Sequence, residues 1–139
     1  MTKIIEGGKF SDHRGCIRFV NSFDMSDVKR FYLIRNYDLE FIRGWRAHRV
    51  ESRWFFPTIG KFEIACVKLD RWDRPSQDLK VEYYVLDCED QNILHIPPGY
   101  GAAIKALELD SELLVFADSL MGDSKFDDYT FPIDYFKKF

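Results

Sequence analysis

Short apolar or alternating runs, each followed by a turn signal, recur along the whole chain. Such runs are typical of β-strands, in which successive side chains point to opposite faces of a sheet. Glycine and proline punctuate the runs, as at Ile59-Gly60-Lys61 and Pro97-Pro98-Gly99. The expected strands are Cys16–Asn21, Arg30–Arg35, Phe41–Arg46, Arg53–Ile59, Lys61–Leu69, Val81–Asp87, Ile93–Ile96, Ala102–Leu107 and Glu112–Asp118.

Many short strands joined by regular turns predict an all-β domain, built as a sandwich or a barrel. Helical signal is weak: only the tail, Pro132 to Phe139, and the short Met25–Val28 stretch are compatible with a helical turn or two. No repeat, low-complexity tract or linker divides the 139 residues. We therefore expect one domain spanning residues 1–139, long enough to bury its own core.

Composition narrows the class of protein. The net charge is −3, so there is no global basic footprint for nucleic acid, and no apolar run is long enough for a signal peptide or a membrane helix. The three cysteines are widely spaced and include no CxxC pair, which favours reduced thiols over a zinc site or a disulfide framework. These features predict a cytoplasmic protein.

Basic residues concentrate between Arg43 and Arg53. On a strand, Arg46 and His48 share one face and Ala47 takes the other. A histidine flanked by guanidinium groups suits an anionic ligand that has a proton to lose. A solvated basic strand face is the alternative, although the neighbouring tryptophans argue against full solvation; the side on which Arg53 lies stays open.

Several blocks in this order resemble known sequence signatures. The segments Arg43–Trp54 and Ile93–Ala103 together resemble the paired motifs of the cupin superfamily. Within it, the chain is similar to the dTDP-4-keto-6-deoxyglucose 3,4-ketoisomerases and, more distantly, to the dTDP-4-dehydrorhamnose 3,5-epimerases. The blocks that carry this similarity are Asp12-His13-Arg14-Gly15, Lys29–Ile34, Arg43–Arg49 and the tail Asp127-Asp128-Tyr129 with Asp134-Tyr135. The resemblance implies a cupin jelly-roll barrel (a double-stranded β-helix) with a short C-terminal helical segment, and a homodimer.

The chain departs from those families at three positions. Arg46 stands where both families carry a histidine, and Ala102 replaces the histidine that ends the second motif. One imidazole, His48, holds a divalent transition metal poorly, so we predict no metal and no cofactor. Val115 occupies the place of the tyrosine that the epimerases use, which argues against 3,5-epimerisation.

The resemblance also implies roles for individual side chains. His48 is the expected base or proton shuttle, with Arg46 and Arg43 as partners of the oxyanion or hydroxyls and Tyr32 as a hydrogen-bond donor to the sugar. Each of two residues also has a structural alternative. Tyr32 could be a packed strand residue, and His95 could cap the floor of the barrel. The remaining expected contacts are Arg14 and Arg53 to the diphosphate, His95 to the substrate, and Trp45, Tyr100 or Phe19 to the thymine ring.

These expectations define the leading hypothesis, a metal-independent isomerase or epimerase of a nucleotide-linked 4-keto-6-deoxysugar. Its partner is the nucleotide sugar, with no nucleic acid or membrane involved, and it would serve deoxysugar biosynthesis for cell-surface polysaccharides. One alternative is a non-catalytic cupin that binds a nucleotide sugar or another anionic sugar. A structural or partner-binding barrel is another, but it leaves the guanidinium groups around His48 unexplained.

Overall fold

The computed structural model describes residues 1–136, and the regular secondary structure in this range is almost entirely β. Its strands and single short helix are β1 (Lys3–Glu6), β2 (Gly8–Asp12), β3 (Gly15–Phe19), β4 (Arg30–Ile34), β5 (Ile42–His48), β6 (Arg53–Ile59), β7 (Lys61–Lys68), β8 (Val81–Asp87), β9 (Asn92–Ile96), β10 (Tyr100–Ala106), β11 (Glu112–Ala117), α1 (Met121–Ser124) and β12 (Tyr129–Thr130). The all-β prediction is confirmed. The sequence pattern missed β1, β2 and β12, which are short or polar.

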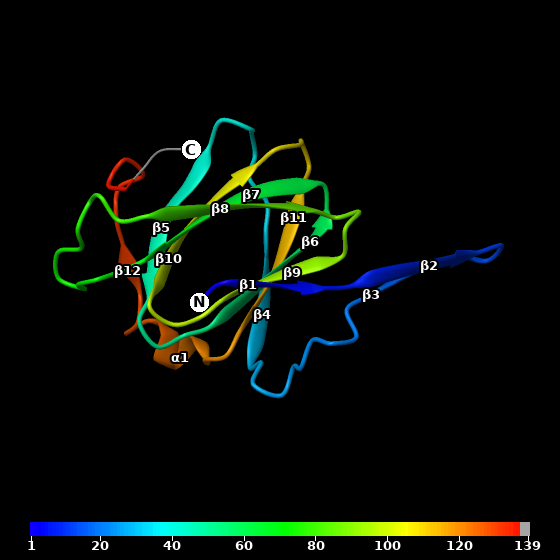
Figure 1. Ribbon diagram of the computed structural model, residues 1–139, viewed down its shortest axis with the longest axis horizontal. Coiled ribbons are helices and arrows are strands. Elements are labelled where there is room, and N and C mark those ends of the chain that lie inside the picture. The colour runs from blue at the N-terminus through cyan, green and yellow to red at the C-terminus, as the bar shows by residue number, and fades with distance from the viewer. Residues whose placement is uncertain (137–139) are drawn as a thin grey trace.

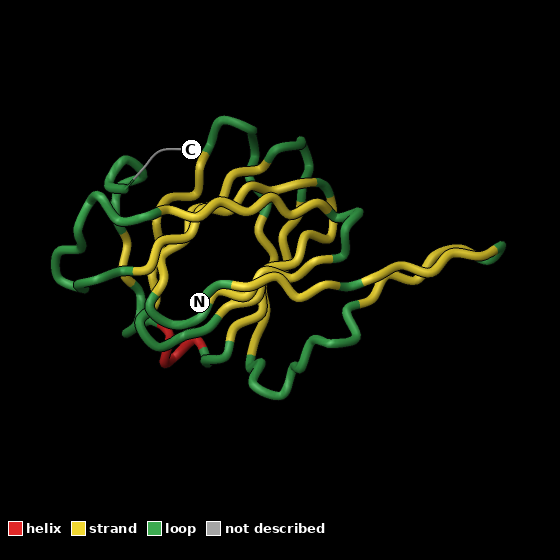
Figure 2. The backbone as a smooth tube through the Cα atoms, in the orientation of Figure 1, coloured by secondary structure: helices red, strands yellow, loops and turns green. Residues whose placement is uncertain are grey.

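Two five-stranded antiparallel sheets face each other and enclose the barrel (Figures 1 and 2). One sheet has the order β1-β9-β6-β11-β4 and the other β12-β5-β10-β7-β8. Neighbours in each sheet are mostly distant in sequence, as in the jelly roll that the resemblance implies. No helix within residues 1–136 has the length and apolar character needed to cross a membrane.

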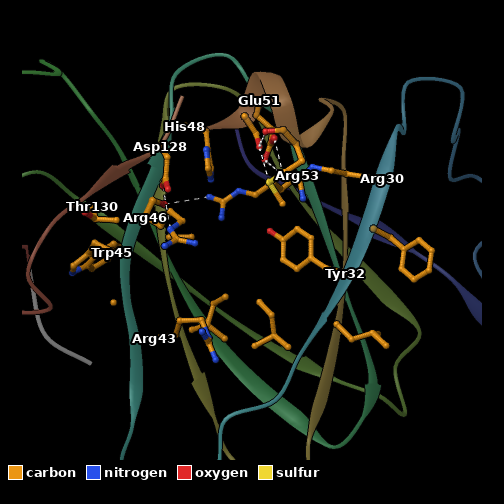
Figure 3. Close-up of a pocket in the computed structure, with 18 of the residues that line it drawn as sticks. Arg30, Tyr32, Arg43, Trp45, Arg46, His48, Glu51, Arg53, Asp128 and Thr130 are labelled. Carbon is orange, nitrogen blue, oxygen red and sulfur yellow. Dashed lines mark hydrogen bonds and ion pairs between the residues drawn. The ribbon is translucent and has the colours of Figure 1, made fainter. Parts of the chain in front are cut away.

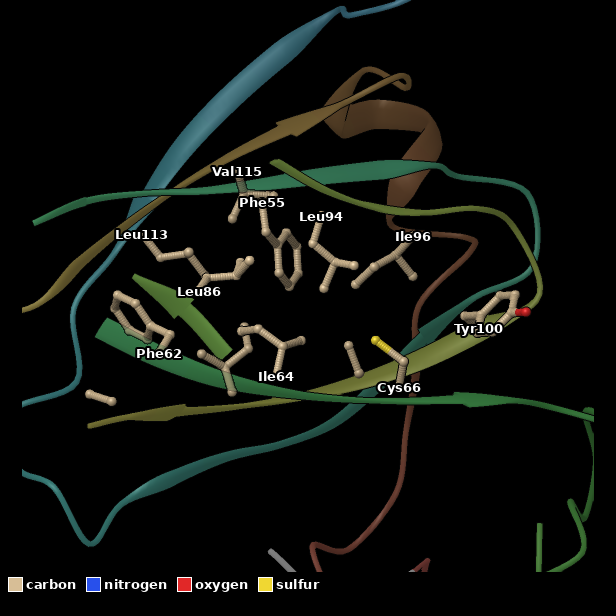
Figure 4. Close-up of a cluster of buried hydrophobic side chains, with 13 residues drawn as sticks. Phe55, Phe62, Ile64, Cys66, Leu86, Leu94, Ile96, Tyr100, Leu113 and Val115 are labelled. Carbon is tan, nitrogen blue, oxygen red and sulfur yellow. The ribbon is translucent and has the colours of Figure 1, made fainter. Parts of the chain in front are cut away.

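The interior of the barrel is filled from both sheets (Figure 4). Phe55 and Leu94 from one sheet meet Phe62 and Ile64 from the other, and all four are fully buried. Burial of an apolar side chain of this size stabilises the fold by about 1.5–3 kcal/mol. Two members of this core, Ala102 and Ile104, also line the cavity described below, so the core adjoins the polar part of the barrel.

A second core lies outside the barrel, between the β5–β10–β7 face and the C-terminal segment. Trp45 and Ala47 point outward from β5 and pack against Phe136, which is 4% exposed. Residues 132–136 make a turn, with Tyr135 N–H donating to the carbonyl of Pro132, so the described part of the expected tail helix is not helical. Residues 137–139 of that expectation lie outside the described residues. The helix that does form, α1, comes earlier in the C-terminal region.

The hairpin β2–β3 projects away from the barrel (Figures 1 and 2). Its pairing places Phe10 opposite Ile17 on one face and Lys9 opposite Arg18 on the other. Phe10 and Ile17 are 55% and 61% exposed, so one face of this ribbon is apolar and uncovered within the chain. Two-stranded hairpins are at best marginally stable alone in water, and an apolar face of this kind calls for a covering surface.

Candidate active site

A cavity of about 1060 Å³ opens beside the barrel core. Its walls come from β4, β5, β6 and β10 and from the segment that contains α1 and β12 (Figure 3). Of the residues expected at a site, those that line this cavity are Tyr32, Arg43, Trp45, Arg46, His48 and Arg53, although the Trp45 side chain itself lies in the outer core.

Strand β5 supplies three of these polar side chains. Alternation puts Arg46 and His48 on the cavity side and Ala47 in the outer core, as the sequence predicts. Between the pairs Ala102–Arg46 and Ile104–Arg43 the register shifts, because β5 has one residue more than β10. Such a bulge changes the alternation, and Arg43 therefore also reaches the cavity (Figure 3).

His48 is 6% exposed and turns its ring toward the cavity (Figure 3). Its Nδ1 lies 2.6 Å from the backbone carbonyl oxygen of Asp127. Burial, and after it the nearby Arg53 charge, hold the pKa of His48 below its ordinary value, against the opposing effect of the Asp127 carbonyl. The imidazole is therefore neutral, and able to accept a proton, at neutral pH.

Arg53 is a buried cation on the cavity wall. Its side chain extends beneath the His48 ring, toward Arg46 and the hydroxyl end of Tyr32 (Figure 3). The residue is 4% exposed, its guanidinium carbon lies 5.4 Å from the Phe55 ring centroid, and its Nη2 donates to the Arg46 carbonyl at 3.4 Å. Among residues 1–136 no carboxylate forms an ion pair with it. A buried guanidinium with so few partners is suited to an anionic ligand.

Three ion pairs of the described residues border the same cavity, and one of them joins Arg35 Nε to Glu112 Oε2 at 3.2 Å. Arg30 Nη2 lies 3.1 Å from Glu51 Oε2, and Arg46 Nε lies 3.2 Å from Asp128 Oδ1. Arg30 also lies 5.2 Å from the Tyr32 ring centroid, which fixes one side of that ring. Together the described cavity walls carry six cationic side chains and three carboxylates, so the cavity is electropositive.

Five of the residues expected at the site do not present a side chain to this cavity. Arg14 lies in the hairpin turn and pairs with Asp12 at 2.7 Å, far from the cavity. Tyr100 is 6% exposed within the barrel core, and His95 stacks on Trp54 with ring centroids 4.9 Å apart, so neither lines the cavity. The indole of Trp45 donates to the Ile133 carbonyl and is 1% exposed in the outer core, so its ring has no face free for a base. Phe19, at the base of the hairpin, is also outside the cavity.

Other cavity residues were missed from the sequence. Arg30 was within reach of prediction, because it is two residues from Tyr32 and so shares its face of β4. Glu51 lies in an irregular turn, and Asp128 comes from a segment about eighty residues away, where periodicity carries no information. No group of three or more histidine, cysteine or acidic side chains within residues 1–136 is arranged to hold a metal ion.

Comparisons with known proteins agree with this geometry. The family model described as FdtA: WxcM-like, C-terminal matches residues 1–139. No curated protein sequence matches the chain.

Several solved structures share the fold at low sequence identity. QdtA, a sugar 3,4-ketoisomerase from Thermoanaerobacterium thermosaccharolyticum in complex with TDP, is 18% identical with a TM-score of 0.73, over 96% of this chain and 90% of that one. The WlaRB TDP-quinovose 3,4-ketoisomerase from Campylobacter jejuni is 22% identical with a TM-score of 0.67, over 86% and 85%. The dTDP-4-dehydrorhamnose 3,5-epimerase from Bacillus anthracis, with TDP and PPi bound, is 17% identical with a TM-score of 0.75, over 93% and 77%. These likenesses confirm the cupin barrel.

Proposed function

Because the chain belongs to the family described as FdtA (WxcM-like, C-terminal), we propose that it isomerises or epimerises a dTDP-linked 4-keto-6-deoxyhexose without a metal. The structural neighbours named as sugar 3,4-ketoisomerases support this reaction class, and a QdtA mutant is described in complex with TDP-4-keto-6-deoxyglucose. The observation that carries the proposal is a buried, neutral imidazole facing an electropositive cavity.

The geometry suits proton transfer next to a ketone. The C4 carbonyl acidifies the C3–H bond, and His48 removes that proton to leave an enediolate. The Arg53 guanidinium, whose charge acts on His48, stabilises the oxyanion together with Arg46. The proton returns at C4 while a hydroxyl proton moves from O3 to O4, with Tyr32 as the hydrogen-bonding group, so substrate and product are isomers. Arg43, farther from His48 in Figure 3, suits the diphosphate.

One observation favours binding without turnover as a second candidate. Arg46 holds the position of a second histidine in the resembled families, and a guanidinium does not act as a base near neutral pH. Its Nε instead forms an ion pair with Asp128 Oδ1 at 3.2 Å. A cavity with one base and several cations also fits a protein that holds an anionic sugar without converting it.

Deuterium exchange separates the two candidates. The protein is incubated with dTDP-4-keto-6-deoxyglucose in deuterated water, and the sugar protons are followed by NMR. Turnover predicts exchange at C3 that falls by about 100- to 10,000-fold in His48→Asn, the contribution typical of a general base. His13→Asn, an exposed histidine on the hairpin, serves as the matched control and retains exchange. Nucleotide binding without exchange supports the second candidate, and no binding of any nucleotide rules out both.

The same proposal includes a cytoplasmic homodimer that serves the synthesis of cell-surface polysaccharide. The apolar face of the β2–β3 hairpin, with Phe10 and Ile17 exposed, supports a second copy as its cover. The three cysteines are free, which suits a reducing compartment.

A further inference from the structure

Asp127 lies just before β12 and contacts both His48 and the turn that follows it. Its carboxylate accepts three successive backbone N–H groups: Oδ1 that of Arg49 at 2.7 Å, and Oδ2 those of Val50 at 2.9 Å and Glu51 at 2.8 Å. Charge-assisted bonds of this kind are about twice as strong as neutral ones. One side chain therefore holds the first three residues of the turn between β5 and β6, the two strands that carry His48 and Arg53.

The backbone carbonyl of the same residue contacts the imidazole. His48 Nδ1 lies 2.6 Å from the Asp127 oxygen, and a carbonyl oxygen only accepts hydrogen bonds. The proton must then sit on Nδ1 in the neutral ring. The lone pair is left on Nε2, the nitrogen on the opposite side of the ring from Asp127.

These two contacts depend on each other. The three bonds to the turn fix the Asp127 peptide, and that fixed peptide determines where its carbonyl oxygen stands relative to His48. The pairing of Tyr129 with Ala47 attaches the same segment to β5 on its other side. Without the carboxylate, β12, a strand of only two residues, is the remaining attachment close to the histidine.

We propose that Asp127 is a positioning residue, whose carboxylate holds its own carbonyl against His48 so that the base keeps its proton on Nδ1 and its lone pair on Nε2. The inference rests on the proposed function for its catalytic consequence, but the tautomer itself is a property of the free protein. Asp127 does not line the cavity, so it acts through His48 rather than on the substrate.

The tautomer is measured directly by imidazole ¹⁵N NMR, which distinguishes a protonated ring nitrogen from one with a lone pair. His48 is assigned by comparison with His48→Asn, and the spectrum is recorded well above the pKa of the ring, in the full chain without ligand. We expect a single neutral form with the proton on Nδ1. A proton on Nε2, or a rapid mixture of both forms, overturns the proposal whether or not the protein turns over a sugar.

Variants then test the carboxylate. Asp127→Ala removes all three bonds to the turn but keeps the backbone carbonyl, and Asp127→Asn keeps one acceptor oxygen. We expect mixed tautomers and a kcat lowered about 10- to 100-fold in Asp127→Ala, with KM changed by less than about threefold, and a smaller change in Asp127→Asn.

Asp118→Ala is the matched control, because Asp118 Oδ1 accepts the next N–H along, that of Ser52, at 2.8 Å without touching His48. It should leave the tautomer and kcat unchanged. An unaltered tautomer in both folded Asp127 variants, or an equal change in Asp118→Ala, overturns the positioning role. If the Asp127 variants fail to fold, the wild-type spectrum still decides whether the carbonyl sets the tautomer.

Discussion

Arg30 and Glu51 form an ion pair of 3.1 Å at the edge of the cavity, and the Glu51 side chain is 1% exposed while that of Arg30 is 19% exposed. Ser119 donates a further hydrogen bond to the same carboxylate, and Arg30 Nε donates to the Ser119 carbonyl at 2.9 Å. This closed network connects β4 to the turns after β5 and β11. The hydrogen-bonding groups of this network are paired with one another. We therefore assign Glu51 a structural role rather than that of a catalytic acid.

Glu51→Gln should destabilise the fold, because it leaves the partly buried Arg30 guanidinium without its counter-charge. We expect the free energy of unfolding to fall by about 1–3 kcal/mol, less than for a fully buried pair because Arg30 keeps some contact with water. Urea unfolding measures the change. In Glu89→Gln, which removes an exposed pair with Lys9, the loss should be below about 0.5 kcal/mol; equal losses in the two variants would contradict this account.

Arg53→Met should separate stability from function. Replacing a buried, unpaired cation with an apolar side chain of similar length is expected to raise the free energy of unfolding by about 1 kcal/mol. Nucleotide-sugar affinity should fall by about 10- to 100-fold, as calorimetry would show, because a charge-assisted bond is lost. Arg43→Met changes an exposed cation of the same cavity and should alter stability by less than about 0.5 kcal/mol. A less stable Arg53→Met protein would show that Arg53 is paired in a way the structure does not reveal.

The pH dependence of kcat/KM should show the lowered pKa of His48. The neutral ring is the base, and its fraction rises with pH, so the acidic limb should lie below the ordinary value of 6.5 with a plateau through neutral pH. Removing the Arg53 charge should move that limb upward, since this cation lowers the pKa of His48. A limb above 6.5 in the wild type would count against a buried base.

The same shift has a consequence for stability. The unfolded chain binds a proton to this imidazole at higher pH than the folded one, so stability rises with pH through this window. His48 therefore contributes stability that is fully present above 6.5 and is lost as the pH falls toward the lowered pKa of the folded state. Thermal unfolding of wild type and His48→Asn between pH 5 and pH 8 measures the difference, which should shrink at the acidic end.

The hairpin predicts the oligomeric state. Phe10→Asp combined with Ile17→Asp places charges on the exposed apolar face and should weaken dimerisation by at least about 100-fold, given about 1.5–3 kcal/mol for each large side chain buried. Sedimentation equilibrium measures the dissociation constant. Ser11→Asp adds a charge on the opposite, polar face of the same hairpin and should leave the dimer intact. If the wild-type protein is a monomer at micromolar concentration, the proposal that a second copy covers the apolar face of the hairpin is wrong.

Local pattern was sufficient for much of the barrel and for part of the site. Period-two alternation identified nine of the strands and put Arg46 and His48 on one face, because the pleat of a strand is a local property. The same alternation places Arg30 on the face of β4 that carries Tyr32, so Arg30 could have been predicted as a site residue. Alternation alone would place Arg43 on the opposite face from Arg46, and Arg43 reaches the cavity only because of a bulge in β5 that depends on how this strand pairs with β10.

The sequence by itself determined an all-β sandwich or barrel and a lone histidine among guanidinium groups, because strand periodicity and residue chemistry are encoded locally, and the cupin form of the barrel followed from the resemblance of its motifs to that superfamily. Tertiary structure alone decided that Arg53 is buried beneath that histidine, that Arg14 and His95 lie elsewhere, and that Asp127, seventy-nine residues away, meets its ring. Those outcomes depend on which distant segments pack together. Contacts between distant segments depend on the tertiary interactions of the whole chain, so they cannot be predicted from a local sequence pattern.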